Sequence, residues 1–256
     1  MFSIICWSLV LSLIINGVLF LLAFRFKSDK LTDASYAISF IALALFAFLK
    51  SQRTSYITVG VVLVCIWATR IGSFLLYRVL RAGSDHRFDG MRENFWRFGK
   101  FWLGQALTVW ILMLPITLLS SGKSQWHSFA LIGVAAWLTG FVLESVADFQ
   151  KYRFAQNPAN KKQWIESGLW YYSRHPNYFG EILVWIGIYL YAFPGLSLAS
   201  KLVSIVSPLL ITTLLLFVSG IPILEKSADK RWGSEPAYKV YKHRTSILIP
   251  LPKKRA

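Results

Sequence analysis

The chain has few charged residues and very few acidic ones for its length. Of its 256 residues 16% are charged, and only 12 are Asp or Glu, whereas about 25% of a typical soluble domain is charged. With 55% hydrophobic and 16% aromatic residues, this composition excludes a disordered chain. The two cysteines, Cys6 and Cys65, both lie in apolar stretches, which excludes a disulfide scaffold.

Sequence signatures of several familiar sites are also missing. The chain has no Gly-x-Gly-x-x-Gly, so no Rossmann domain is expected. Its histidines are scattered, whereas a di-iron site needs histidine and carboxylate ligands in a cluster. We therefore predict no metal site. The four histidines are His86, His127, His175 and His243.

Long apolar runs are abundant. A membrane-spanning helix needs about 20 mostly apolar residues, and seven segments meet or approach that length. The sequence therefore predicts an all-α integral membrane protein, a single domain (1–256) of seven transmembrane helices with a tail over 225–256. Pro208 and Pro222 predict a kink or an early stop in the seventh helix. The predicted spans are 2–24, 33–49, 56–80, 101–120, 127–147, 177–195 and 202–224.

Basic residues are distributed unequally between the two sides of these spans. Of the 28 Lys and Arg residues, 23 follow odd-numbered spans and 4 lie on the other side. Because cytoplasmic loops carry the excess of Lys and Arg, we expect the N-terminus outside and the C-terminus in the cytoplasm. The net charge of +16 then reflects topology and anionic lipid, not nucleic acid. The expected location is a bacterial inner membrane.

Charged residues inside the predicted spans, or at their ends, form a second feature. Such charges are costly in a membrane and usually functional. Arg70 lies within the third span, and Asp33 opens the second. Glu144 and Asp148 are one helical turn apart in the fifth, and Glu181 begins the sixth. One polar cavity open to the cytoplasm would hold them all. The alternative is an ion pair of Arg70 with Glu144 or Glu181 that only packs helices.

Residues 168–181, Gly-Leu-Trp-Tyr-Tyr-Ser-Arg-His-Pro-Asn-Tyr-Phe-Gly-Glu, concentrate aromatic and polar side chains. Arg174 offers two parallel donors to a phosphate. A helix starting at Pro176 directs free N–H groups and its positive dipole end toward the same place. Asn177 offers a donor and an acceptor, and the aromatic side chains offer flat faces for a ring. The segment therefore favours an anion with an attached ring. The alternative is an aromatic and basic interfacial belt.

The order of these residues resembles the signature of the steroid 5α-reductase family, in its bacterial branch of membrane proteins. Five further stretches are similar to that branch in the same order along the chain. They are Trp-Ala-Thr-Arg-Ile-Gly over 67–72, Asp-His-Arg-Phe over 85–88, Glu-Ser-Val-Ala-Asp over 144–148, Ser-Gly-Ile-Pro-Ile-Leu-Glu over 219–225 and Arg-Thr-Ser-Ile-Leu-Ile-Pro over 244–250.

The resemblance implies a seven-helix reductase that binds NADPH from the cytoplasmic side. It would transfer hydride to a carbon–carbon double bond conjugated to a ketone in a lipophilic, steroid-like substrate. The family's acid and tyrosine at the ketone correspond to Asp33 and Trp67, and Trp67 donates a hydrogen bond but cannot deliver a proton. Signature residues His175 and Glu181 are further candidate cofactor contacts. The resemblance implies cofactor binding by Arg70, Arg81, Glu144, Asp148, Arg153, Tyr172, Arg174, Asn177, Tyr178, Tyr241 and Arg244.

An S-adenosylmethionine-dependent membrane methyltransferase is the main alternative. Isoprenylcysteine carboxyl methyltransferases share an Arg-His-Pro followed by Tyr and Gly, and a later glutamate followed by paired tyrosines, as Glu225, Tyr238 and Tyr241 are here. The additional cytoplasmic arginines and the Leu-Ile-Pro ending favour the reductase. A transporter or lipid-binding scaffold is a third hypothesis, although no internal repeat is visible. In either enzyme, 232–241 would form a short interfacial helix covering the cofactor.

Overall fold

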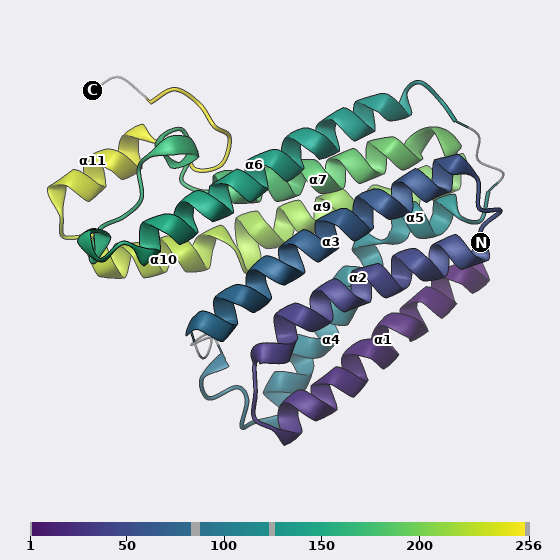
Figure 1. Ribbon diagram of the computed structural model, residues 1–256, viewed down its shortest axis with the longest axis horizontal. Coiled ribbons are helices and arrows are strands. Elements are labelled where there is room, and N and C mark those ends of the chain that lie inside the picture. The colour runs from purple at the N-terminus through teal and green to yellow at the C-terminus, as the bar shows by residue number, and fades with distance from the viewer. Residues whose placement is uncertain (1, 83–87, 123–125, 254–256) are drawn as a thin grey trace. The chain divides into compact units, whose positions relative to one another are not determined.

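A computed structural model describes residues 2–82, 88–122 and 126–253, so His86 lies outside the described residues (Figure 1). The described chain is helical, and the strand-like pairing within it is one parallel bridge between Ser173 and Ser246. The sequence predicts that the chain is a single domain. Its contacts divide it into two compact units, the first made of 1–131 and 188–207 and the second of 132–187 and 208–256.

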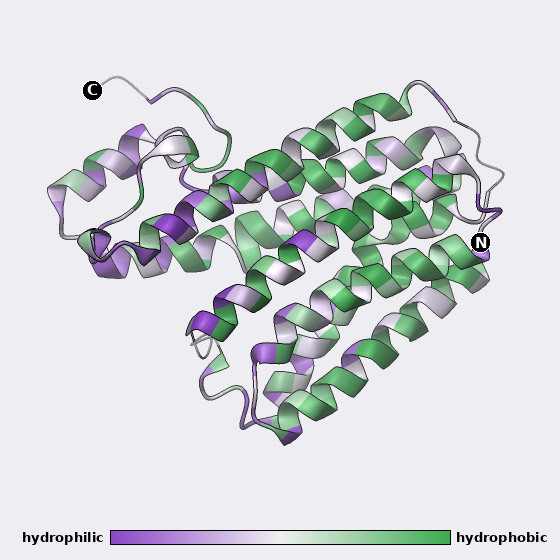
Figure 2. Cartoon of the chain, viewed as in Figure 1, coloured by the Kyte–Doolittle hydropathy of each residue, from purple (hydrophilic) through white to green (hydrophobic). Residues whose placement is uncertain are grey.

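Six helical stretches of the described chain are long and apolar enough to cross a membrane, so this is a multi-pass membrane protein. Hydrophobic residues cover most of their length (Figure 2). They match the first three and last three of the seven predicted spans. They are α1 (Phe2–Arg25), α2 (Lys30–Lys50), α3 (Ser55–Ala82, apolar to Arg81), α6 (Ala130–Gln156), α7 (Pro176–Ala192) extended to Gly195, and the interrupted stretch Leu198–Trp232.

The segment predicted as a fourth span over 101–120 differs from that prediction. It forms two helices, α4 (Phe95–Leu112) and α5 (Leu114–Leu119), separated at Met113. Pro115 causes the break, because it has no amide hydrogen to donate to the turn before it. The N-terminus of α4 is capped by Asn94, whose side chain accepts a hydrogen bond of 3.0 Å from the amide of Arg97. This segment is not among the six apolar stretches, so the count of seven stays a prediction.

The interruption predicted in the last span is confirmed. The stretch is divided into α8 (Leu198–Ser204), α9 (Val206–Thr213), the π-helical η5 (Leu214–Val218) and α10 (Ile221–Trp232). The first break precedes Pro208 and the second precedes Pro222, as expected because proline removes a donor and crowds the preceding turn. The second break separates the polar helix α10 from the apolar run that precedes it.

In the first unit, α2 packs against α1 and α3, and α1 also packs against α4. A buried polar seam joins three of these helices. The side-chain amide of Gln105 donates to Asn16 over 3.0 Å and to Ser35 over 2.6 Å, and Asn16 donates to Ser39 over 3.0 Å. Hydrogen bonds of this kind between membrane helices contribute about 0.6–2 kcal/mol each.

In the second unit, α6 and α7 touch backbone to backbone at glycines. A Cβ atom built on Gly180 would lie 2.5 Å from the amide nitrogen of Glu144, and one on Gly140 would lie 2.5 Å from the carbonyl oxygen of Gly180. Without an apolar driving force in lipid, helices associate through this close approach of small residues. The contact fixes the position of α7, and therefore of the signature that precedes it, along α6.

Substitution of Gly180 tests this contact. Gly180→Ala places a methyl group against the backbone of α6, so we expect destabilisation by about 1–3 kcal/mol, as in other overpacked cores. The matched control is Gly104→Ala in α4, where no atom lies within 4 Å of the added Cβ. Thermal unfolding of the detergent-purified variants measures both. An unchanged melting temperature in Gly180→Ala would contradict the close packing.

Candidate functional site

The signature segment is held against the end of α6 by hydrogen bonds to one side chain and one backbone carbonyl of α6. Gly168 has a φ of +62° and opens the short helix η3 (Gly168–Tyr171), where the amide of Leu169 donates to the side-chain oxygen of Gln150 over 2.9 Å. The indole of Trp170 donates to the carbonyl of Ala147 over 3.0 Å. These bonds fix the path of the chain before the N-terminus of α7, so the residues that follow are held in place.

Arg174 and His175 converge on a single carboxylate. One terminal nitrogen of Arg174 lies 2.6 Å from Oε2 of Glu225, and Nε2 of His175 lies 2.8 Å from Oε1 of Glu225. Lys242 of α11 (Pro236–Arg244) approaches the same carboxylate at 3.3 Å. Side-chain exposure is 11% for Arg174, 6% for His175 and 16% for Glu225. Glu225 therefore ties the signature to α10 in a mostly dry environment.

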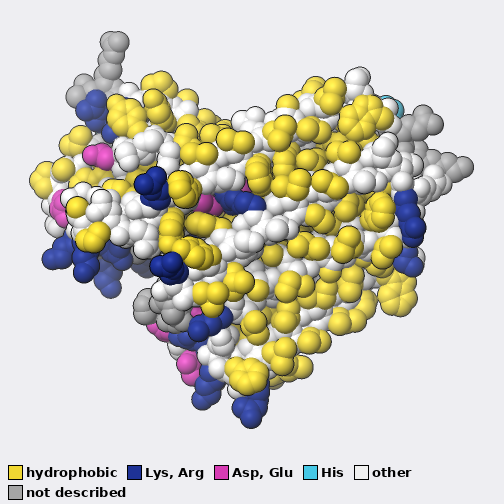
Figure 3. Space-filling view, in the orientation of Figure 1, with side chains coloured by type: hydrophobic (Ala, Val, Ile, Leu, Met, Phe, Trp, Pro, Cys, Tyr) yellow, Lys and Arg dark blue, Asp and Glu magenta, His cyan; other side chains and the backbone are white. Residues whose placement is uncertain are grey.

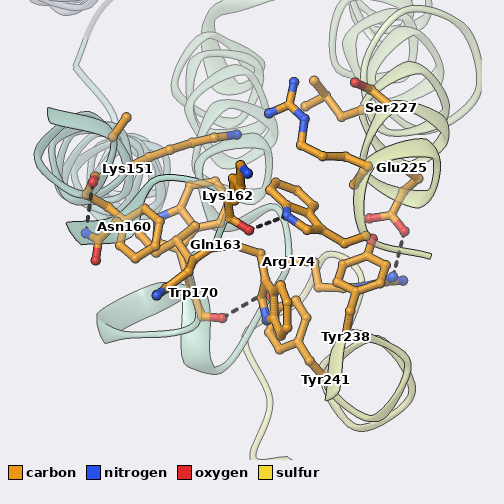
Figure 4. A pocket seen from close by; sticks show the side chains of 18 of the residues that line it. Lys151, Asn160, Lys162, Gln163, Trp170, Arg174, Glu225, Ser227, Tyr238 and Tyr241 are labelled. Carbon is orange, nitrogen blue, oxygen red and sulfur yellow. Dashed lines mark hydrogen bonds and ion pairs between the residues drawn. The ribbon is translucent and has the colours of Figure 1, made fainter. Parts of the chain in front are cut away.

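A cavity of about 370 Å³ opens beside this network, between the end of α6, the loop over 157–167, α10 and α11 (Figure 4). Lys151 reaches in from α6, and Glu225 lies on the opposite side (Figure 4). The cationic lining residues are Lys151, Lys162, Arg174 and Arg231, against the carboxylate of Glu225. The cavity is therefore electropositive and suits an anion. Its aromatic lining residues are Phe154, Trp164, Trp170, Trp232, Tyr238 and Tyr241.

Three buried polar atoms at this cavity have no hydrogen-bond partner among the described residues. They are Nε of Arg174, Nδ1 of His175 and Nε1 of Trp164. Buried polar atoms are normally satisfied, and an orphan costs about 1–3 kcal/mol. All three atoms belong to residues that line the cavity, but each atom is itself shielded from solvent.

The rings around the cavity form one packed cluster. Trp164 lies 5.3 Å from Tyr238 and 6.2 Å from both Trp232 and Tyr241, measured between ring centroids. Burial raises the pKa of Tyr238 to about 12 and also raises the pKa of Tyr241, so both phenols keep their protons at neutral pH. The indole of Trp232 donates to the carbonyl of Lys162 over 2.7 Å, which ties α10 to the loop over 157–167.

The predicted cofactor residues separate into groups in the structure. Arg174, His175 and Tyr241 line the cavity. The ring of Tyr178 stacks on His175 at 5.7 Å, and Asn177 donates to Asp148 over 3.1 Å. Of the remaining candidates in the second unit, Glu144 is buried, Glu181 is half-buried and Tyr172 is exposed, and none of the three lines the cavity; nor does Arg244.

Arg153 lines a neighbouring hollow of about 390 Å³. The two hollows share Phe154 and Asn160 in their walls. Arg153 therefore lies close to the cavity without lining it.

The other predicted residues belong to the first unit. Trp67 is fully buried, with its ring 5.2 Å from that of Phe40. Asp33 lies half-buried in the first turn of α2, Arg70 is half-buried, and the exposed Arg81 lies over the ring of Tyr77 at 5.3 Å. The roles implied for these four residues stay predictions.

Sequence reasoning missed several lining residues. Lys151, Lys162, Trp164 and Arg231 were not among the candidates, although all four line the cavity. Lys151 follows Asp148 by three positions and so shares its helix face, which is a signal that the sequence contains. Trp164, a single indole in a charged loop, is a second one. The helix expected over 232–241 forms in part as α11, which begins at Pro236 and contributes Tyr238 and Tyr241 to the cavity.

Comparison with known proteins places the chain in a family. Residues 19–245 match the family described as "Protein of unknown function (DUF1295)". The chain belongs to this family. It is also 22% identical, over 279 aligned positions, to an uncharacterized protein of Schizosaccharomyces pombe, covering 94% of this chain and 78% of the yeast protein. No solved structure matches the chain at a significant level.

Removal of the Glu225 carboxylate tests the network. Glu225→Ala leaves the mostly buried side chains of Arg174 and His175 without their acceptor. We expect the unfolding free energy to fall by about 2–3 kcal/mol. This is less than the full cost of breaking a buried ion pair, because the site is partly exposed. The control is the exposed Glu235→Ala, with an expected loss under about 0.5 kcal/mol. Equal melting temperatures for the two variants would contradict this description.

The buried His175 predicts a pH dependence. Burial lowers its pKa below the usual 6.5, and the cations of Lys151 and Arg174 act in the same direction, although the hydrogen bond to Glu225 opposes them. The unfolded chain therefore binds the proton first as pH falls. The contribution of neutral His175 to folding stability is therefore complete above pH 6.5. It is lost as pH falls through the lower pKa that His175 has in the folded protein. Melting temperatures from about pH 8 to pH 5 measure this loss, and His175→Gln should reduce the slope. A slope unchanged in that variant would contradict the assignment.

Proposed function

We propose that the chain is an NADPH-dependent membrane reductase that transfers hydride to a carbon–carbon double bond conjugated to a ketone in a lipophilic substrate. The observation that carries the proposal is the cavity, in which Lys151, Lys162, Arg174 and Arg231 surround an aromatic cluster. The resemblance of residues 168–181 to the steroid 5α-reductase signature supplies the reaction class.

The cationic and aromatic residues of the cavity suit the charge and the ring of this cofactor. Its pyrophosphate and 2′-phosphate carry several negative charges, and the lining cations exceed the one lining carboxylate. Arg174 and His175 both line the cavity, and the terminal nitrogens of Arg174 could donate to phosphate oxygens. Trp164 and Tyr238 offer ring faces for the adenine. When bound, NADPH supplies the hydride.

The chain's own side chains would bind, orient and exclude water. Arg174 is held by Glu225, so its remaining donors are oriented before a ligand arrives, which lowers the ordering cost of binding. A helical bundle surrounded by lipid keeps water from the reacting carbons. Asp33, at the position that the resemblance assigns to the family's acid, would donate to the ketone oxygen only in its protonated form, as that oxygen gains negative charge.

The finer topology belongs to the same proposal. Seven spans, an outer N-terminus and a cytoplasmic C-terminus would place the cavity on the cytoplasmic side, because the cavity is built from segments after the fifth and seventh predicted spans. The exposed cations Lys226 and Lys230 on α10 support this orientation, since they would face anionic lipid headgroups. Lys and Arg side chains gather where α10 lies (Figure 3). The proposed location is a bacterial inner membrane.

One observation favours S-adenosylmethionine as a second candidate ligand. Glu225 lies among aromatic rings on the cavity wall, and a carboxylate with ring faces also suits a sulfonium cation. The surplus of lysine and arginine favours the phosphorylated cofactor.

Ligand-dependent stabilisation distinguishes the two cofactors. NADPH at 100 times its dissociation constant should stabilise the detergent-purified protein by about 2.7 kcal/mol. Lys162→Ala and Arg231→Ala should each weaken NADPH binding by about tenfold, one charge-assisted contact being lost in each. The control Lys239→Ala changes an exposed cation of α11 that does not line the cavity and should leave the affinity unchanged. Stabilisation by S-adenosylmethionine alone would overturn the reductase and support the methyltransferase.

A further inference from the structure

The last described residues of the chain run alongside the signature segment. The amide of Arg174 donates to the carbonyl of Ser246 over 2.8 Å, and the amide of Leu251 donates to the carbonyl of Tyr172 over 3.2 Å. The parallel bridge between Ser173 and Ser246 lies between these bonds. We call residues 246–253 the C-terminal strap. The strap is thus attached to the backbone immediately before the helix that starts at Pro176.

The hydroxyl of Ser173 connects the strap to His175. This side chain is fully buried. Its Oγ donates to the carbonyl of Leu248 over 2.7 Å and accepts from the amide of His175 over 3.1 Å. One hydroxyl therefore links the strap to His175, whose imidazole contacts Glu225. Because the two bonds use the donor and an acceptor of the same oxygen, movement of the strap would be transmitted to His175.

The end of the strap supports the cavity wall. The ammonium of Lys253 lies 4.1 Å from the ring centroid of Tyr171 and 5.6 Å from that of Tyr241, which lines the cavity. It also lies 3.6 Å from a carboxylate oxygen of Glu166. A cation over an aromatic face is attractive, so this residue holds the strap against η3 and α11 together.

We propose that the C-terminal strap and Ser173 are positioning elements of the cofactor cavity. They hold Arg174 and His175 in the geometry in which both meet Glu225. None of the strap residues lines the cavity, so the strap acts through the signature segment. The assignment rests on the proposed function only for the identity of the ligand, because the contacts themselves do not involve a cofactor.

Two readouts on the full-length protein test this proposal. The first is the rate at which diethyl pyrocarbonate modifies His175, located by mass spectrometry. The second is the dissociation constant for NADPH. The variants are a deletion of residues 246–256 and Ser173→Ala. The controls are a deletion of residues 254–256 and Ser173→Thr, which leave the strap and the hydroxyl in place.

In the intact protein the 5% exposure of His175 predicts slow modification. The deletion of 246–256 should raise that rate, and weaken NADPH binding, at least tenfold. Ser173→Ala should change both in the same direction, and Ser173→Thr should restore both. If the longer deletion prevents folding, the two Ser173 variants decide. The proposal would be overturned if Ser173→Ala left both the modification rate of His175 and the affinity for NADPH unchanged. It would also be overturned if Ser173→Thr did not restore them. Faster modification in a protein that never binds NADPH would support the strap and refute the proposed cofactor.

Discussion

The second unit depends on one carboxylate. Glu225 accepts from Arg174 and His175 at 2.6 and 2.8 Å, and so joins the segment before α7 to a helix 50 positions later in the chain. A mostly buried carboxylate is tolerated only when cations and hydrogen-bond donors surround it. The same carboxylate therefore holds Arg174 and His175 in the wall of the cavity that both residues line.

Backbone contact between α6 and α7 positions the signature so that Arg174 and His175 can contact Glu225. Because Gly140 and Gly180 allow the two helices to touch, Asn177 reaches Asp148 one turn beyond, and η3 docks on Gln150 and Ala147. A larger residue at Gly180 would push α7 and the signature away from α6. The C-terminal strap then holds the same segment from its other side. Helix packing, the ion network and the strap thus determine a single position for Arg174.

A small part of the cavity lining could be predicted from the sequence. Arg174 was selected by residue type and by the resemblance, Tyr241 by the resemblance alone, and both line the cavity. Lys162 and Trp164 were missed because a loop of mixed polar residues has no periodicity to show which side chains turn inward. Their position follows from the hydrogen bond between the indole of Trp232 and the carbonyl of Lys162. The apolar composition of 101–120 predicted a span there but gave no sign of the break before Pro115 that divides it into α4 and α5.

The sequence by itself determined that the chain is a multi-pass helical membrane protein and that residues 168–181 carry its densest polar chemistry. Both follow from composition. A long apolar segment in lipid must form a helix, and charged residues within such segments are rare and usually functional. Only the tertiary structure decided which side chains share a cavity, that Glu225 is the common partner of Arg174 and His175, and that the strap lies against Ser173. Hydrogen bonds act over about 3 Å and in a fixed direction, and positions distant in the chain acquire such geometry only when the backbone has folded.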